Sequence, residues 1–150
     1  MMNTYSPWDE LAAHGDALDL HWQPLRGRGG QYQHHLRRIT LDPRMPRRQI
    51  RAVLCHELRH AEAGDEHTAC DRTNLRQEQV ADQRAARLLI DVRDMARAMV
   101  VHDCHHSAVA VELRVSDRLL GVRLDHLHPS ERHWINSQLF DVTGGVGDES

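Results

Sequence analysis

The first third of the chain contains short stretches in which polar and apolar residues alternate, a pattern typical of half-buried strands. Ser6 and Pro7 mark the start of a short helix, because serine is a favoured N-cap residue and proline fits the first helical turn. Glycine and proline between residues 24 and 30 indicate a turn. We therefore expect a small antiparallel three-stranded sheet after a short helix; the helix covers residues 7–13 and the strands 18–22, 31–35 and 36–41.

From residue 47 the apolar residues recur three and four positions apart, which is the period of an amphipathic helix. Gly64 is placed to end this first long helix, because glycine is common just after a helix C-terminus. Two further helical patterns cover residues 75–90 and 92–101. The pattern predicts an α+β protein in which the sheet packs on a pair of long helices; the apolar stripe of the first consists of Ile50, Val53, Leu54, Leu58 and Ala61.

The last third of the chain has the pattern of a helix-turn-helix. One helix ends near Leu113, Ser116 is a candidate N-cap for the next, and a final helix follows Ser130. The glycine-rich C-terminus has no apolar periodicity. We expect a core over residues 1–101, a helical segment over 102–142 and a flexible tail over 143–150.

Composition narrows the class of protein. The 150 residues carry a net charge of −3 and 19 arginines without a lysine, which we attribute to codon bias in a GC-rich genome. No apolar run approaches the roughly 20 residues of a membrane helix, and the N-terminus lacks the features of an export signal. The three cysteines are an odd number at unrelated spacings, which suits free thiols in a reducing compartment better than disulfides. We therefore expect a cytoplasmic protein with no membrane partner.

The first long helix contains the motif His56-Glu57-Leu58-Arg59-His60, an HExxH sequence. Residues four apart lie on one helical face, so His56 and His60 can offer nitrogens to one zinc ion (Zn2+). Glu57 lies one residue on, within reach of a water that zinc activates. The spacing predicts a zinc peptidase in which Glu57 is the catalytic base.

A catalytic zinc ion needs a third protein ligand, and two residues are candidates. His67 falls one residue late for the pattern HExxHxxGxxH. Glu78 shares the inward face of the second helix with Ala81 and Ala85, so we expect its carboxylate to be buried. A buried carboxylate needs a partner, and a metal ion can be that partner. We favour Glu78, with Asp82 one turn later as a carboxylate that orients a ligating histidine.

The HExxH motif, followed by Glu78-Gln79-Val80-Ala81-Asp82 and then by Ala85-Ala86-Arg87-Leu88-Leu89, resembles the ImmA/IrrE family of metallo-endopeptidases. The resemblance extends over residues 6–135 and is greatest to a compact actinobacterial and phage-type branch of the family. It implies a gluzincin-type site, in which His56, His60 and Glu78 bind zinc and Glu57 is the general base. It also implies an intracellular enzyme that cleaves a protein partner, a helix-turn-helix repressor or similar regulator. Arg59 departs from a glycine that is frequent in the family motif.

Two rival interpretations stay open. The first is a DNA-binding transcription regulator that uses residues 108–128, with a structural metal site; the near-zero charge of this segment disfavours it. The second is a metal-retaining interaction protein without turnover, against which the intact Glu57 argues. A second metal site over residues 102–106 is also conceivable from its histidines, but a solvated linker explains them more simply.

Overall fold

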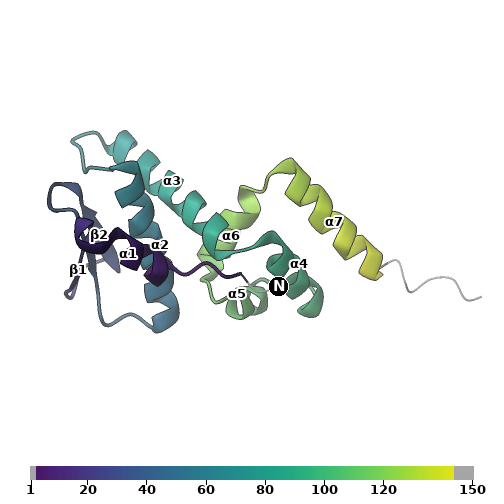
Figure 1. Ribbon diagram of the computed structural model, residues 1–150. Helices are drawn as coiled ribbons and strands as arrows, with labels where there is room; N and C mark the ends of the chain where they lie inside the picture. The colour runs from purple at the N-terminus through teal and green to yellow at the C-terminus, as the bar shows by residue number, and fades with distance from the viewer. Residues whose placement is uncertain (1–2, 144–150) are drawn as a thin grey trace, which may run out of the picture. The chain divides into compact units, whose positions relative to one another are not determined.

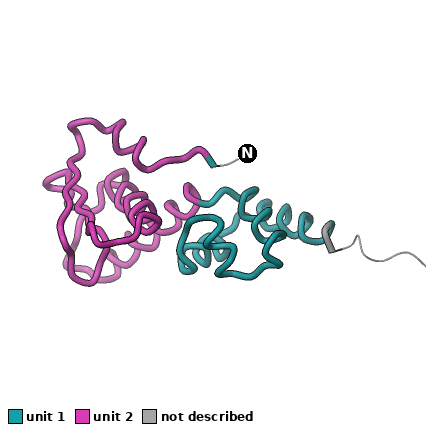
Figure 2. Tube along the Cα trace, turned by 90° about the horizontal axis from the view of Figure 1, so that it is seen from below, with its two compact units in different colours: residues 1–3, 90–150 teal, residues 4–89 magenta. Residues whose placement is uncertain are grey.

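The computed structural model describes residues 3–143 and divides into two compact units. The N-terminal unit covers Thr4–Leu89, and the C-terminal unit begins at Ile90 and includes Asn3 (Figure 2). The boundary after residue 101 that the sequence predicts stays a prediction. Of the predicted flexible tail, residues 144–150 lie outside the described residues.

The N-terminal unit has the predicted order of a short helix, three strands and two long helices (Figure 1). Short 3-10 turns follow the first helix and the second strand. The elements are α1 (Pro7–His14), β1 (Asp19–Trp22), β2 (Gly30–Gln33), β3 (Arg38–Leu41), α2 (Arg47–Ala63) and α3 (Asp71–Leu89). The α+β class is therefore as the sequence predicts.

The sheet is mixed, so the prediction of an antiparallel sheet is wrong. Its strand order is β1-β3-β2, with β1 parallel and β2 antiparallel to β3. The strand β3 is therefore central, and its residues Ile39 and Leu41 are fully buried. The segment 23–29 passes around the end of β3, where Gln23 donates to the carbonyl of Leu41. The pairing of β1 with β3 joins strands that are not consecutive in the chain. The alternation of polar and apolar residues within a strand does not reveal such a pairing.

The helix α2 packs against the sheet through its apolar stripe. Leu54, Leu58 and Ala61 form one buried cluster with the sheet residues Ile39 and Leu41. The helix ends at Gly64, whose φ of 68° is a left-handed conformation that glycine adopts at low cost. The predicted helix and its stop signal are both confirmed.

The helix α3 begins at Asp71, four residues before the predicted start. The amide side chain of Asn74 accepts from the backbone of Thr68 and donates to its carbonyl, which closes the turn before the helix. The first turn is polar and contributes nothing to apolar periodicity, so the pattern could not reveal it. Further along, buried Ala81, Ala85 and Ala86 are small enough for α2 and α3 to approach closely.

The C-terminal unit is helical and comprises α4 (Val92–Val101), α5 (His106–Leu113), α6 (Asp117–Asp125) and α7 (Pro129–Thr143). Ser116 caps α6 by accepting from the backbone of Leu119, as predicted. Ser130 does not cap the last helix, because α7 already begins at Pro129. The helix-turn-helix assignment of α5 and α6 stays a prediction.

A buried arginine ties this helical unit together. Arg123 is 4% exposed, donates to the carbonyl of Ile90 at 3.0 Å and pairs with Glu131 at 2.5 Å. Because the Arg123 guanidinium is buried and paired in this way, it is not available to bind a DNA phosphate. None of the helices in the described part of the chain is long and apolar enough to cross a membrane.

Asp42 holds the segment 23–29 in place, and we predict that Asp42→Asn destabilises the protein at neutral pH. Hydrogen bonds from Arg44 and from the backbone of Leu25 hold the pKa of the Asp42 carboxyl well below its ordinary value of 3.8. Because the pKa is lowered by folding, this stabilisation is fully present above pH 3.8 and is lost as the pH falls below it.

Urea unfolding followed by circular dichroism measures the effect. The midpoint of Asp42→Asn is lower than that of the wild type at pH 7, and the difference shrinks below pH 3.8. The exposed Asp16→Asn serves as the matched control and leaves the midpoint unchanged. Equal midpoints of the wild type and Asp42→Asn at pH 7 contradict the prediction.

Candidate metal centre

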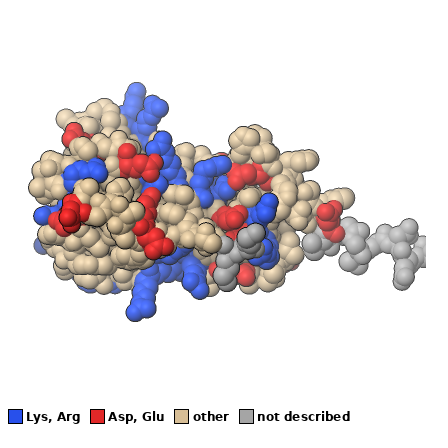
Figure 3. Space-filling model, viewed as in Figure 1, with Lys and Arg blue, Asp and Glu red and all other residues tan. Residues whose placement is uncertain are grey.

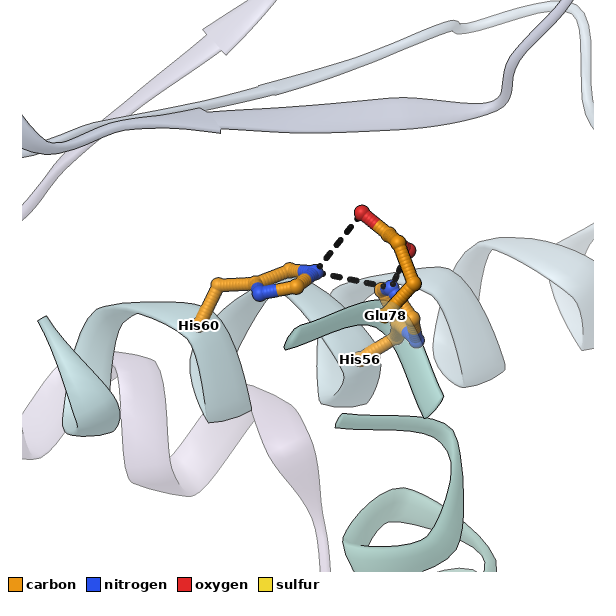
Figure 4. Close-up of side chains that lie close together, drawn as sticks. All are labelled: His56, His60 and Glu78. Carbon is orange, nitrogen blue, oxygen red and sulfur yellow. Dashed lines mark hydrogen bonds and ion pairs between the residues drawn. The ribbon is translucent and has the colours of Figure 1, made fainter. Parts of the chain in front are cut away.

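Two histidines of α2 and one glutamate of α3 bring their polar atoms together at one point (Figure 4). The Nε2 atoms of His56 and His60 are 3.0 Å apart. The carboxylate of Glu78 faces both rings, with one oxygen 2.9 Å from His56 Nε2 and the other 3.2 Å from His60 Nε2. The ligand atoms of these three residues all lie within 4.8 Å of one another, which is the spacing that one metal ion requires.

The far side of each histidine ring faces a carboxylate. Asp82 lies 2.9 Å from Nδ1 of His56, and Asp65 lies 2.8 Å from Nδ1 of His60. A protonated Nδ1 donates to its aspartate, and the Nε2 lone pair of each ring then points to the centre. Asp82 thus lies where the sequence places an orienting carboxylate.

Asp65 was not identified from the sequence. It lies in the loop after α2, where Gly64 turns the chain back and the amide of Asp65 donates to the carbonyl of His60. This turn returns the aspartate to the last turn of α2. An acidic residue directly after a helix-ending glycine is a signal that could have pointed to it.

Glu57 lies beside the three converging residues, on the face of α2 that the sheet covers. Its residue is 6% exposed, and a Cβ atom on Gly30 of β2 would lie 3.2 Å from Glu57 Cγ. Burial raises the pKa of the Glu57 carboxyl to about 7, against the opposing effect of the two histidines. A carboxyl with this pKa can both accept and release a proton near neutral pH.

The electrostatics of the centre favour positive charge. Burial lowers the pKa of His56, but its hydrogen bonds to Asp82 and Glu78 outweigh this and raise the pKa to about 10. Hydrogen bonds from His56 and His60 hold the pKa of the Glu78 carboxyl well below its usual range. The two rings share their surroundings with four carboxyl groups, so a cation between them is electrostatically stabilised.

Glu78 reaches the centre from a more open position than the sequence predicts. Its side chain is 60% exposed, whereas we expected a buried carboxylate on the inward face of α3. Its oxygens are nevertheless directed to the two imidazoles (Figure 4). The position of Glu78 beside the histidines agrees with the prediction. The expectation that its carboxylate is buried is wrong.

Two other residues near the motif have different surroundings. His67 is exposed and is not part of the cluster, the one group of potential metal ligands that residues 3–143 contain. Arg59 is 6% exposed and forms ion pairs with Glu10 of α1 and with Glu62. The arginine that departs from the family motif therefore anchors α1 to α2.

The donor set suits zinc: two imidazole nitrogens, one carboxylate oxygen and second carboxylates behind the rings. A family model described as the IrrE N-terminal-like domain matches residues 17–125. These residues include both histidines and the glutamates of the candidate centre. Searches of curated proteins and of solved structures found no match. The chain therefore belongs to the IrrE N-terminal-like domain family of metallopeptidases, as its resemblance to the ImmA/IrrE family predicts.

Proposed function

We propose that this protein is a zinc-dependent endopeptidase of the gluzincin type, with His56, His60 and Glu78 as the metal ligands. The observation that carries the proposal is the convergence of two Nε2 atoms and one carboxylate within 4.8 Å. Three protein ligands leave a position open, which distinguishes a catalytic zinc site from a closed structural one. Zinc bound there supplies Lewis acidity and lowers the pKa of water.

Glu57 is the general base in this proposal. Its buried carboxyl lies next to His56 in sequence and, with a pKa of about 7, can take a proton from the water that attacks a peptide carbonyl. The same carboxyl can then deliver that proton to the amine that leaves. Asp82 and Asp65 hold the imidazole rings of His56 and His60 in the orientation that directs both Nε2 atoms inward.

The substrate in this proposal is a protein partner in the cytoplasm, a helix-turn-helix repressor or similar regulator in phage, mobile-element or stress regulation. Support for a protein substrate comes from membership of a peptidase family. The alternative, a regulator that binds DNA through residues 108–128, is disfavoured because Arg123 is buried in an ion pair with Glu131.

We predict that the wild-type chain binds about one zinc ion and that His60→Ala and Glu78→Ala lose most of this binding. Each substitution removes one of three ligands, and two do not hold the ion. Gln79→Ala is the matched control, because Gln79 is an exposed neighbour of Glu78 on α3. Metal analysis after dialysis measures the stoichiometry. Full zinc content in Glu78→Ala excludes Glu78 as a ligand.

Glu57→Gln is expected to keep its zinc and to lose proteolytic activity by about 100-fold or more, because an amide cannot take up the proton. Glu62→Gln is the control: its side chain is 55% exposed on the same helix and interacts with Arg59 rather than with the centre. Cleavage of a candidate repressor, resolved by mass spectrometry, is the readout. Undiminished cleavage by Glu57→Gln contradicts the proposed mechanism.

Asp65→Asn and Asp82→Asn are each expected to weaken zinc binding by about 10- to 100-fold, because an orienting carboxylate makes its histidine a better ligand. Asp71→Asn, at the exposed start of α3, is the control with the same change of charge. Competition with a chromophoric chelator measures the affinities. Affinities equal to that of Asp71→Asn show that the two aspartates do not position the ligands.

A further inference from the structure

Positive charge is concentrated in one part of the N-terminal unit. Residues 20–56 contain eight arginines and a single acidic residue, Asp42, although the chain as a whole has a net charge of −3. These residues form the sheet and the first half of α2. In Figure 3, arginines project from the edge of the unit at which α2 begins in Figure 1.

The fold brings two arginine-bearing segments together. The loop 23–29 is fixed at one end by a hydrogen bond from Gln23 to the carbonyl of Leu41, and at the other by one from Asp42 to the carbonyl of Gly29, at 2.8 Å. Arg44 donates to the carbonyl of Leu25 in the middle of the loop, at 3.1 Å. The loop therefore lies against the segment that leads into α2.

Besides Arg44, four arginines of these segments are exposed: Arg26 and Arg28 on the loop, and Arg47 and Arg48 in the first turn of α2. Arg44 lies between them and pairs with Asp42. Within residues 3–143, none of the four forms an ion pair. We call these four residues the arginine surface. Their guanidinium groups form no ion pair with another described residue and face solvent.

The arginine surface borders the candidate metal centre. Gly30 follows the loop directly, and its backbone lies over Glu57. Arg48 lies just over two helical turns before His56 on α2, about 12 Å along the helix axis. Burial raises the pKa of Glu57, and Arg28 is among the positive charges close enough to oppose this rise.

We propose that the arginine surface binds an acidic stretch of the peptidase substrate, about four residues away from the bond that is cut. The distance follows from the rise of an extended chain, about 3.3 Å per residue, over the 12 Å that separate Arg48 from His56. Guanidinium groups bind carboxylates through paired hydrogen bonds, which gives them selectivity as well as attraction. The proposal rests on the proposed peptidase function.

A peptide fits this surface better than a nucleic acid does. A DNA-binding protein neutralises about 6–10 phosphates, whereas the arginine surface has four arginines and the whole chain is negative. The arginine surface also lies beside the candidate metal centre, and the family to which the chain belongs is a family of peptidases.

Fluorescence anisotropy with the full-length wild type tests the proposal without requiring cleavage. The probes are a labelled peptide of alternating glutamate and threonine, a matched glutamine–threonine peptide and a short DNA duplex. We expect the acidic peptide to bind more tightly than the other two, and its binding to weaken as salt screens the charges. Mass spectrometry confirms that the peptide stays intact.

The double substitution Arg28→Gln/Arg48→Gln is expected to weaken binding of the acidic peptide by about tenfold. The control variant Arg72→Gln/Arg76→Gln removes two exposed arginines from α3. It is expected to change the affinity for the acidic peptide by less than about twofold. All four positions are exposed, and circular dichroism checks that both variants are folded.

Three results overturn the proposal: equal binding of the acidic and neutral peptides, equal losses in the two double variants, or tighter binding of DNA through Arg28 and Arg48. Zinc content and cleavage by Glu57→Gln are measured separately. A failure of the arginine surface is therefore distinguishable from a failure of the peptidase assignment.

Discussion

Three electron-pair donors that face one another need a cation between them. When both imidazoles are neutral and donate through Nδ1 to their aspartates, His56 and His60 direct lone pairs at each other across 3.0 Å, and the carboxylate of Glu78 faces both. Such an arrangement is repulsive unless a proton or a metal ion occupies it. Much of the N-terminal unit serves to hold these groups in this arrangement.

Each structural element around the centre contributes one constraint. The helical repeat of α2 aligns the two histidines, and small alanines let α3 approach closely enough for Glu78 to reach them. Gly64 ends α2 and returns the chain so that Asp65 meets His60. Gly30 leaves room for Glu57 beneath the sheet, where burial raises the pKa of its carboxyl to about 7. Helix and turn geometry together place the Glu57 carboxyl next to the candidate metal centre.

The features that could be predicted from the sequence are those that depend on local periodicity. HExxH on an amphipathic helix places His56 and His60 on one face whatever the rest of the chain does. The family resemblance indicated Glu78, whereas the argument from a buried inward face does not hold, because its side chain is 60% exposed. Asp65 lies in a loop without periodicity, and the pairing of β1 with β3 joins strands far apart in sequence. Both depend on tertiary structure, which local patterns do not encode.

X-ray absorption spectroscopy at the zinc edge, on the full chain loaded with one equivalent of zinc, tests the central claim most directly. The account predicts a first shell of nitrogen and oxygen at about 2.0–2.2 Å, with the outer-shell scattering of two imidazole rings and no sulfur. Cys70 and Cys104 are exposed thiols, so a zinc ion bound through either of them would show sulfur at about 2.3 Å. A sulfur shell, or the absence of imidazole scattering, would contradict a centre formed by His56, His60 and Glu78.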